Sequence, residues 1–223
     1  MLPVRALILD LDGVVTDTAE QHLAAWGALA DRLGVPLPDD VRDRLRGRSR
    51  EDSLRLILGE RFASLGDDEV RALLDAKDAD YLAAVARMGP HDVLPGALAL
   101  IDRARALGLA VAIGSASRNA RRILERLDLA ERFDAIADGT TVERAKPAPD
   151  VFLAAARLVD VEPAACLVVE DAAAGIEAAR AAGMRCVGIG PDARVGAADL
   201  VLPSVEALDL DAVLARLVVV DGA

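Results

Sequence analysis

Two aspartates near the start of the chain have the types and spacing for nucleophilic or acid–base chemistry. The apolar run at residues 4–9 leads directly into Asp10-Leu11-Asp12-Gly13-Val14. Such a short apolar run is typical of a buried parallel strand, and ligands of open parallel sheets bind at the carboxyl ends of the strands. Residues two apart in an extended chain face the same way, so both carboxylates would point into one site. The alternative is an ordinary acidic turn in which Gly13 supplies a positive φ.

A hydroxyl-rich loop is the second candidate. Gly114-Ser115-Ala116-Ser117 follows another apolar run and leads into a predicted helix that begins at about Asn119. Its hydroxyls and free backbone amides suit a phosphate group. The alternative is that these side chains only cap the following helix.

A lysine and a second acidic pair complete the set. The chain has 26 basic residues, and only Lys77 and Lys146 among them are lysines. Lys146-Pro147 falls in a predicted loop, where the proline restricts the backbone and favours an aimed cation over a solvated one. Glu170-Asp171 follows the apolar run at residues 166–169. Because adjacent carboxylates repel each other, a pair at a strand end usually serves a cation or caps the next helix.

The elements that must position these groups alternate along the chain. Apolar strand-like runs occur at residues 4–9, 109–113, 166–169, 186–189 and 200–202. Helical patterns occur between and after them, at residues 97–107, 120–127, 150–159, 175–182 and 205–217. This alternation predicts an α/β fold with a doubly wound, Rossmann-like parallel sheet. The candidate groups would then meet at the carboxyl ends of its strands.

One long segment departs from this alternation. Residues 18–88 contain no convincing strand, and their helical patterns lie at residues 19–33, 38–46, 50–58 and 67–87. We therefore expect two domains: an α/β core made of residues 1–17 and 89–223, and a helical cap made of residues 18–88 that is inserted after the first strand.

Composition limits the classes of partner. A chain of 223 residues that is 53% hydrophobic can form one core with an inserted lobe. Its net charge of −11 argues against nucleic acid and anionic membranes as main partners. No apolar run approaches the roughly 18 residues of a membrane span, and the N-terminus lacks a signal-peptide pattern. Cys166 and Cys186 lie in apolar runs and are expected to be reduced core residues of a cytoplasmic protein.

The four polar groups, in this order, resemble those of the haloacid dehalogenase superfamily of phosphotransferases, and the resemblance covers the whole chain. It implies that Asp10 is the nucleophile, which forms an aspartyl-phosphate, and that Asp12 is the general acid/base. The ligands that it implies for a Mg²⁺ ion are Asp10, the Asp12 carbonyl, Glu170 and Asp171. The residues that it implies around the transferring phosphoryl group are Ser115, Ala116 and Lys146. The chemistry agrees, because a carboxylate that attacks an anionic phosphoryl group needs cations to offset the repulsion.

The inserted segment is similar to the helical cap of the β-phosphoglucomutase family. The similarity lies in residues 16–22 (TDTAEQH), Trp26, 45–53 (LRGRSREDS), Lys77 and Tyr81, and in core residues 115–119 (SASRN), 133–138 (FDAIAD) and 146–150 (KPAPD). It implies that His22 couples Asp12 to cap closure. It also implies that Arg50, with Ser117 and Asn119, holds a second phosphate. The further substrate contacts that it implies are Trp26, Arg46, Gly47, Lys77 and Arg118, and the hinge residues are Thr16, Asp17 and Thr18.

Structural explanations exist for several of these residues. A lone histidine in a helix is more often structural or solvated than catalytic, Trp26 would be a core residue, and Arg50 is one of many arginines. The sequence also departs from the family, because Arg46 and Arg118 stand where some members have lysine, which changes the geometry of the donors.

The resemblance implies a definite activity, the interconversion of β-D-glucose 1-phosphate and β-D-glucose 6-phosphate through β-glucose 1,6-bisphosphate. The partners would be small-molecule sugar phosphates, and we expect a monomer. One alternative is a capped sugar-phosphate or phosphoglycolate phosphatase, in which water attacks the aspartyl-phosphate. A non-catalytic phosphosugar-binding module is disfavoured, because Asp10, Asp12 and the Glu170-Asp171 pair are all present.

Overall fold

Six short strands form one parallel sheet in the computed structural model, which describes residues 2–45 and 48–219. The strands are β1 (Ala6–Leu9), β2 (Ala110–Gly114), β3 (Ala135–Ala137), β4 (Cys166–Glu170), β5 (Arg185–Ile189) and β6 (Leu200–Leu202). Their order is β3-β2-β1-β4-β5-β6, with every neighbouring pair parallel. The chain winds outward from β1 in one direction and then returns to build the other half from β4. This order confirms the predicted doubly wound sheet and places its binding crevice beside the ends of β1 and β4.

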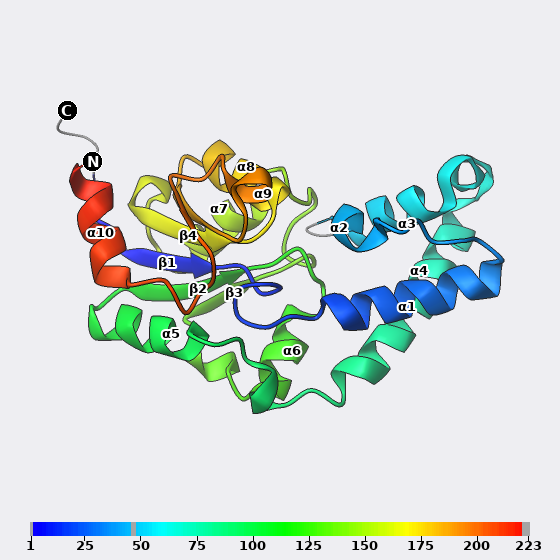
Figure 1. The fold of residues 1–223 in the computed structure, drawn as a ribbon, viewed down its shortest axis with the longest axis horizontal. Coiled ribbons are helices and arrows are strands. Elements are labelled where there is room, and N and C mark those ends of the chain that lie inside the picture. The colour runs from blue at the N-terminus through cyan, green and yellow to red at the C-terminus, as the bar shows by residue number, and fades with distance from the viewer. Residues whose placement is uncertain (1, 46–47, 220–223) are drawn as a thin grey trace.

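Helices cover both faces of the sheet (Figure 1). One layer holds α5 (Ala97–Ala106), α6 (Ala120–Arg126) and α10 (Leu210–Val219), and the other holds α7 (Asp150–Leu158), α8 (Ala173–Ala181) and α9 (Asp192–Val195). Successive side chains of β1 alternate between them, because Leu7 and Leu9 join the first hydrophobic cluster while Ala6 and Ile8 join the second. Across the described residues, every helix is too short or too polar to cross a bilayer. Cys166 and Cys186 are free and buried in the second cluster, as predicted.

Short 3-10 helices complete the connections of the sheet. They are η2 (Pro90–Asp92), η3 (Ala130–Arg132) and η4 (Pro163–Ala165).

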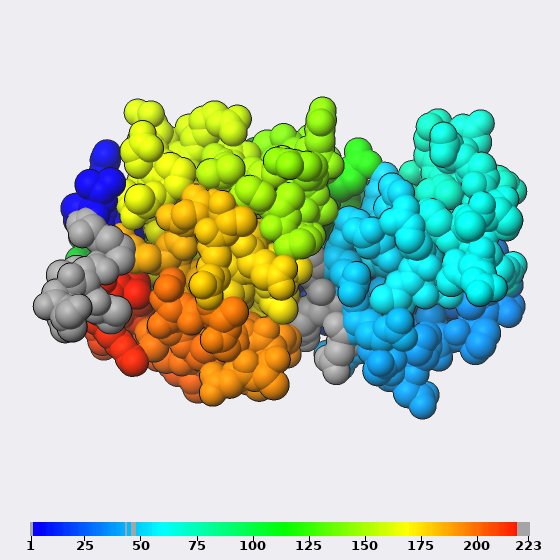
Figure 2. Space-filling model, turned by 90° about the horizontal axis from the view of Figure 1, so that it is seen from above, coloured from blue at the N-terminus to red at the C-terminus, as the bar shows by residue number. Residues whose placement is uncertain are grey.

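The segment inserted after β1 is helical. It comprises α1 (Ala19–Leu33), α2 (Val41–Leu45), α3 (Arg50–Leu58), the 3-10 helix η1 (Gly59–Ser64) and α4 (Asp67–Val85). These helices have a hydrophobic cluster of their own, which includes Trp26, Leu29, Leu54, Ile57 and Leu74. They extend from the sheet in Figure 1, and Figure 2 shows them as a distinct lobe. This arrangement suits a cap that covers the ends of the strands.

The structure differs from the predicted elements at three main places. Helix α9 was not predicted, because its four residues, Asp192–Val195, are too few to show a helical period. Strand β3 was not predicted, because it is three residues long and two of its residues, Ala135 and Ile136, are only half-buried. Helix α10 begins at Leu210 rather than at residue 205. The reason is that Asp209 Oδ1 accepts a hydrogen bond from the Ala212 amide at 3.1 Å, and a side chain that satisfies a free amide in this way marks the start of a helix. The other predicted elements begin and end within a few residues of their predicted bounds.

Candidate active site

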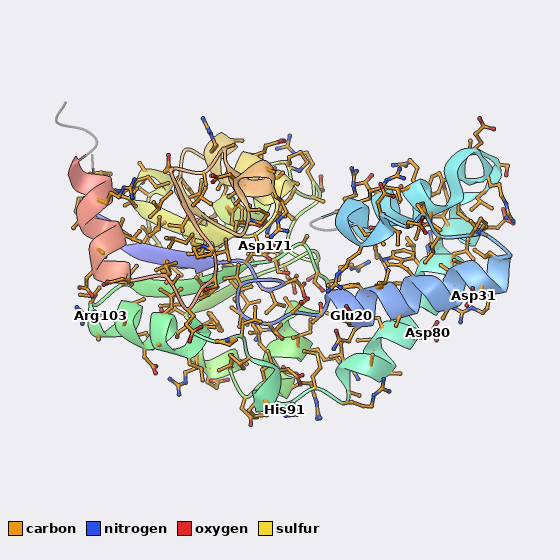
Figure 3. The ribbon with its side chains drawn as sticks, viewed as in Figure 1. Glu20, Asp31, Asp80, His91, Arg103 and Asp171 are labelled. Carbon is orange, nitrogen blue, oxygen red and sulfur yellow. The ribbon has the colours of Figure 1, made fainter. Side chains whose placement is uncertain are left out.

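A cavity lies between the carboxyl ends of the central strands and the inserted helices. The predicted site residues that line it are Asp10, Asp12, Asp17, His22, Trp26, Arg50, Lys77, Ser115, Ala116, Ser117, Arg118, Asn119, Lys146, Glu170 and Asp171. Arg46 and Gly47 fall outside the described residues. Figure 3 labels Asp171 at the edge of the sheet that faces the inserted helices. The structure therefore gathers into one cavity residues that are up to 161 positions apart in the sequence, Asp10 and Asp171.

Strand register places the acidic groups beside each other. Leu9 pairs with Val169 in the β1–β4 ladder, and the Asp10 amide donates to the Val169 carbonyl at 2.9 Å. Asp10 and Glu170 are therefore neighbours at the strand ends. Both are buried, with relative exposures of 7% and 1%. A buried pair of carboxylates needs a cation to compensate it.

Lys146 supplies a positive charge to this pair. Its ammonium lies 2.6 Å from Asp10 Oδ1 and 2.8 Å from Glu170 Oε1, and it lies over the Phe152 ring at 4.6 Å from the ring centroid. Burial alone would lower the pKa of Lys146, but the two carboxylates outweigh burial and raise it. The pKa of Asp10 is raised, mainly by burial and further by Glu170, while Lys146 opposes the rise. The loop that carries Lys146 thus brings its ammonium to the two carboxylates at the ends of β1 and β4.

Three carboxylates could also hold a metal ion. One oxygen each from Asp10, Glu170 and Asp171 lies within 4.8 Å of the others. Two glycines make room for this cluster, because a Cβ at Gly13 would lie 2.3 Å from Asp171 Oδ2 and one at Gly175 would lie 1.7 Å from Glu170 Oε1. Carboxylate oxygens in this number suit a hard divalent cation. The residues present therefore fit a divalent metal.

Asp12 stands apart from that cluster and is held by the chain that leads to the insertion. Thr18 Oγ1 donates to Asp12 Oδ1, and Tyr81 Oη in turn donates to Thr18 Oγ1 at 3.2 Å. Burial raises the pKa of Asp12, the hydrogen bond from Thr18 lowers it, and the nearby charge of Asp17 raises it again. A carboxyl group with a raised pKa is suited to take up and release a proton at this position.

The serine loop after β2 folds on itself. The Ser115 amide donates to the Ala137 carbonyl at 3.0 Å, which fixes the loop at the end of the sheet. Ser115 Oγ accepts from the Ser117 amide at 3.1 Å, and Ser117 Oγ accepts from the Asn119 amide at 3.2 Å. These hydroxyls can still donate their own hydrogens to an anion. The Asn119 side chain itself makes no capping bond to helix α6, while Ser117 Oγ satisfies the Asn119 amide just before the helix, so a local capping role for Ser117 stays compatible with phosphate binding.

The wall formed by the insertion carries a compact polar cluster. Lys77 Nζ lies 3.0 Å from His22 Nδ1, and the His22 and Tyr81 rings stack with their centroids 4.0 Å apart. Burial, and to a lesser degree the charge of Lys77, hold the pKa of His22 well below its usual value of 6.5. This direction favours the neutral form of His22, and because an ammonium can only donate, Nδ1 would accept from Lys77 and Nε2 would carry the ring proton. Trp26 is a core residue of the insertion, 2% exposed, and also borders the cavity.

The two segments that join the insertion to the sheet lie side by side. Thr16 Oγ1 donates to the Asp92 carbonyl at 2.7 Å, and the Leu94 amide donates to the Val15 carbonyl at 2.9 Å. Asp17 Oδ1 accepts from the Ala19 amide at 2.9 Å and helps to start α1. This geometry suits the predicted hinge, because two adjacent segments can turn together.

Sequence reasoning missed several residues of the site. Ser53 and Asp78 line the cavity from the insertion, and Asp78 Oδ2 lies 2.6 Å from Arg50 Nη1. On the sheet side, Arg194 Nε donates to the Asp171 carbonyl at 2.7 Å and so fixes the backbone of that carboxylate. The sequence contains one signal that could have indicated Asp78 as a site residue, namely its position next to Lys77. Arg194 had none, since its partner is 23 residues away in the sequence.

Comparison with known proteins gives a consistent result. Residues 4–183 match the family of haloacid dehalogenase-like hydrolases. The chain is 41% identical to a β-phosphoglucomutase of Bacillus subtilis (strain 168) over 210 residues, and this aligned region covers 93% of each of the two chains. It is 35% identical over 187 residues to a fructose-1-phosphate phosphatase of Escherichia coli (strain K12), covering 82% of this chain and 95% of the other. The fold matches the crystal structure of a β-phosphoglucomutase from Clostridium difficile with a TM-score of 0.93, 33% identity, and coverage of 97% and 99%.

Proposed function

The chain belongs to the haloacid dehalogenase-like hydrolase family, and from this membership we propose that it is a β-phosphoglucomutase, which interconverts β-D-glucose 1-phosphate and β-D-glucose 6-phosphate. The observation that carries the proposal is that cations lie on two walls of one cavity. Lys146 lies beside Asp10 on the wall formed by the sheet, and Arg50 and Lys77 lie on the wall formed by the insertion. A sugar with one phosphate at each end, β-glucose 1,6-bisphosphate, fits such a site.

Asp10 is the nucleophile in this mechanism. Its Oδ1 is held by Lys146, so the other carboxylate oxygen can attack a phosphoryl group and form an aspartyl-phosphate. Lys146 and Ser115, with the amide of Ala116, hold the oxygens of the transferring group and offset the repulsion between two anions. The residues that would hold Mg²⁺ are Asp10, Glu170, Asp171 and the Asp12 carbonyl. When bound, the ion supplies further charge compensation at the phosphoryl oxygens.

Asp12 moves the proton. It takes the proton of the sugar hydroxyl that receives the phosphoryl group from Asp10, and it returns a proton to the leaving oxygen in the second half of the reaction. Its raised pKa supports this role, because the carboxyl group must exchange protons under ordinary conditions. Thr18 restrains Asp12 from the segment that leads to the insertion. This contact links the proton-transfer group to the hinge residues Thr16, Asp17 and Thr18.

The insertion acts as a cap that selects a phosphosugar over water. Arg50, with Ser117 and Asn119 on the facing wall, holds the phosphate that is not reacting. Lys77, Arg118 and Trp26 border the sugar, and His22 couples the cap to Asp12. Arg46 and Gly47, which lie outside the described residues, are further sugar contacts that the family resemblance implies. Closure over a phosphosugar excludes water from the aspartyl-phosphate, which would otherwise be hydrolysed.

The remaining expectations concern the enzyme in the cell. We propose that it acts in the cytoplasm, and two free buried cysteines agree with a reducing compartment. Its division into a core of residues 1–17 and 89–223 and a cap of residues 18–88 is supported by the separate hydrophobic cluster of the insertion. We also propose that it works as a monomer, since one chain supplies both walls of the cavity.

The test is to follow the fate of the phosphoryl group. Purified enzyme is incubated with Mg²⁺, β-D-glucose 1-phosphate and a trace of β-glucose 1,6-bisphosphate, and the products are followed by ³¹P NMR. We expect glucose 6-phosphate to accumulate with little inorganic phosphate. If inorganic phosphate is instead the main product, the chain is a phosphatase, an activity found in its 35% identical relative from Escherichia coli.

A further inference from the structure

One carboxylate on the cap side of the cavity serves two cations. Asp78 Oδ2 lies 2.6 Å from Arg50 Nη1, and Asp78 Oδ1 lies 3.5 Å from Lys77 Nζ. Both contacts are partly shielded from water, because the Asp78 and Arg50 side chains are 20% and 26% exposed and that of Lys77 is 2% exposed. Asp75 is the other carboxylate near Arg50, at 3.8 Å, but its side chain is 67% exposed.

The surroundings of Lys77 make this contact important. Its ammonium lies over two aromatic rings, 4.5 Å from the centroid of Tyr81 and 5.1 Å from that of Trp26. The neutral His22 accepts one of its hydrogens at 3.0 Å. None of these three groups carries a compensating charge, and a buried ammonium without one favours the neutral amine.

The surroundings of Lys77 both lower and raise the pKa of its ammonium. Burial lowers the pKa of Lys77, and the positive charge of Arg50 lowers it further. Asp78 raises it through charge and hydrogen bonding, and Asp12 raises it by a smaller amount. Asp78 is therefore the main counterweight to burial at this position.

We propose that Asp78 is a positioning residue for substrate binding. Its single carboxylate is the shared counter-ion of Arg50 and Lys77, and it therefore fixes the direction of the Arg50 side chain and keeps the Lys77 ammonium charged. The proposal rests on the proposed function in one respect, the assignment of these two cations to the phosphosugar. Its structural part, the coupling between Asp78 and Lys77, is independent of that assignment.

The geometry explains how Arg50 can serve two anions at once. A guanidinium carries five N–H donors in one plane, and a phosphate can take the pair on Nε and Nη2. Asp78 holds Nη1, on the other side of the group. The arginine is thus oriented before the phosphosugar arrives, which saves the ordering of a flexible side chain during binding.

The small number of lysines allows a direct test. Because Lys77 and Lys146 are the only lysines, protein labelled with ¹³Cε-lysine gives two lysine signals, and the signal lost in Lys77→Arg identifies Lys77. Its titration is compared in the wild type, Asp78→Asn, Asp78→Glu and the control Asp75→Asn. We expect Asp78→Asn to lower the titration midpoint of Lys77 by about one pH unit or more. Asp75→Asn should leave it unchanged, and Asp78→Glu, which keeps the charge, should restore most of the difference.

Binding of glucose 6-phosphate to the same proteins, measured by calorimetry from pH 7 to pH 10, tests the consequence. We expect the loss of affinity at alkaline pH to begin about one pH unit lower in Asp78→Asn than in the wild type and Asp75→Asn. An unchanged lysine titration in Asp78→Asn would overturn the counter-ion role. A shifted titration with unshifted binding would overturn the role in substrate binding. If the wild type does not bind the phosphosugar, the proposed function is wrong, while the lysine titration still decides whether Asp78 sets the charge of Lys77.

Discussion

The ammonium of Lys146 lies 2.6 Å from Asp10 Oδ1, and both side chains are almost completely buried. They come from opposite halves of the sequence, one directly after β1 and the other from the loop before α7. Burial raises the pKa of Asp10, and the Lys146 ammonium opposes that rise. This pair gives Asp10 a fixed direction and leaves its second oxygen for chemistry.

Replacing Asp10 by asparagine should abolish both phosphoryl transfer to sugar and hydrolysis of phosphate esters. An amide is neither a nucleophile for this reaction nor an adequate metal ligand. The protein should remain folded, because the two side chains have nearly the same shape and Lys146 keeps its contact with Glu170 at 2.8 Å. Turnover is measured alongside circular dichroism. Residual activity above a few per cent in a clean preparation would contradict the nucleophilic role.

Replacing Asp12 by alanine should slow phosphoryl transfer to sugar and leave divalent-metal binding intact. General acid–base catalysis contributes about 10²–10⁴-fold, and the loss should fall in this range. Metal binding should persist, because the carboxylate cluster consists of Asp10, Glu170 and Asp171. Single-turnover rates and Mg²⁺ titration separate the two effects. A loss of less than tenfold with unchanged metal affinity would mean that another group carries the proton.

Local signals explain why much of the fold could be predicted from the sequence. Helix α1 ends where expected because Gly34 adopts a left-handed conformation, with φ 62°. Helix α3 begins where expected because Ser49 caps it by accepting from the Asp52 amide at 3.1 Å. Strand β3 has no comparable signal, since three small or half-buried residues at positions 135–137 depend on pairing with β2.

The residues of the candidate site also divide into those with a local signal in the sequence and those that depend on tertiary contacts. Asp10, Asp12, Glu170 and Asp171 could be predicted because each pair directly follows an apolar run. The partners of site residues could not, because Asp78 with Arg50 and Arg194 with Asp171 are contacts between different helices and loops. Such contacts depend on tertiary packing and leave no periodic pattern in the chain.

Replacing Lys146 by methionine should destabilise the fold strongly. The change leaves two buried carboxylates, Asp10 and Glu170, without their cation, and breaking a buried pair in this way costs about 3–5 kcal/mol. Urea unfolding measures the loss. The matched control is Arg103→Met, which removes a surface ion pair with Asp211 at 2.6 Å and should change the free energy of unfolding little.

The destabilisation of Lys146→Met should depend on pH in a definite direction. Burial already raises the pKa of Asp10, and without the lysine it should rise further. A carboxyl group with a raised pKa in the folded state costs stability above its unfolded pKa, and the cost disappears as it becomes protonated. The deficit should therefore be largest near pH 7 and shrink toward pH 4–5. A deficit that stays constant over this range would contradict the charge explanation.

His22 should make the folded state less stable in mild acid. Burial holds its pKa well below 6.5 in the folded state, so only the unfolded chain takes up this proton as the pH falls through 6.5. Each pH unit in that window costs up to about 1.4 kcal/mol of unfolding free energy. Urea unfolding at pH 7.5 and pH 5.5 should show a larger loss for the wild type than for His22→Gln. The control is His91→Gln, since the His91 side chain is 79% exposed. Equal losses in the wild type and His22→Gln would rule out this origin.

Replacing Arg50 by alanine should separate mutase from hydrolase activity. If Arg50 holds the distal phosphate, it stabilises the closed cap only when a phosphosugar is bound. A charge-assisted contact contributes about 1.5–3 kcal/mol, so transfer to sugar should fall about ten- to a hundredfold or more. Hydrolysis of the aspartyl-phosphate needs no distal phosphate and should change little, so the ratio of mutase to hydrolase turnover should drop.

The control for that ratio is Arg42→Ala. Arg42 also lines the cavity, but its side chain is 45% exposed and pairs with Glu20 at 2.6 Å. Removing it changes the net charge of the protein as much as removing Arg50 does, and it leaves the Arg50–Asp78 pair in place. A general loss of positive charge would therefore affect both variants alike, whereas a specific grip on the distal phosphate affects only Arg50→Ala. An unchanged ratio in Arg50→Ala, or an equal drop in both variants, would refute the role of Arg50, because the effect would then not come from one contact.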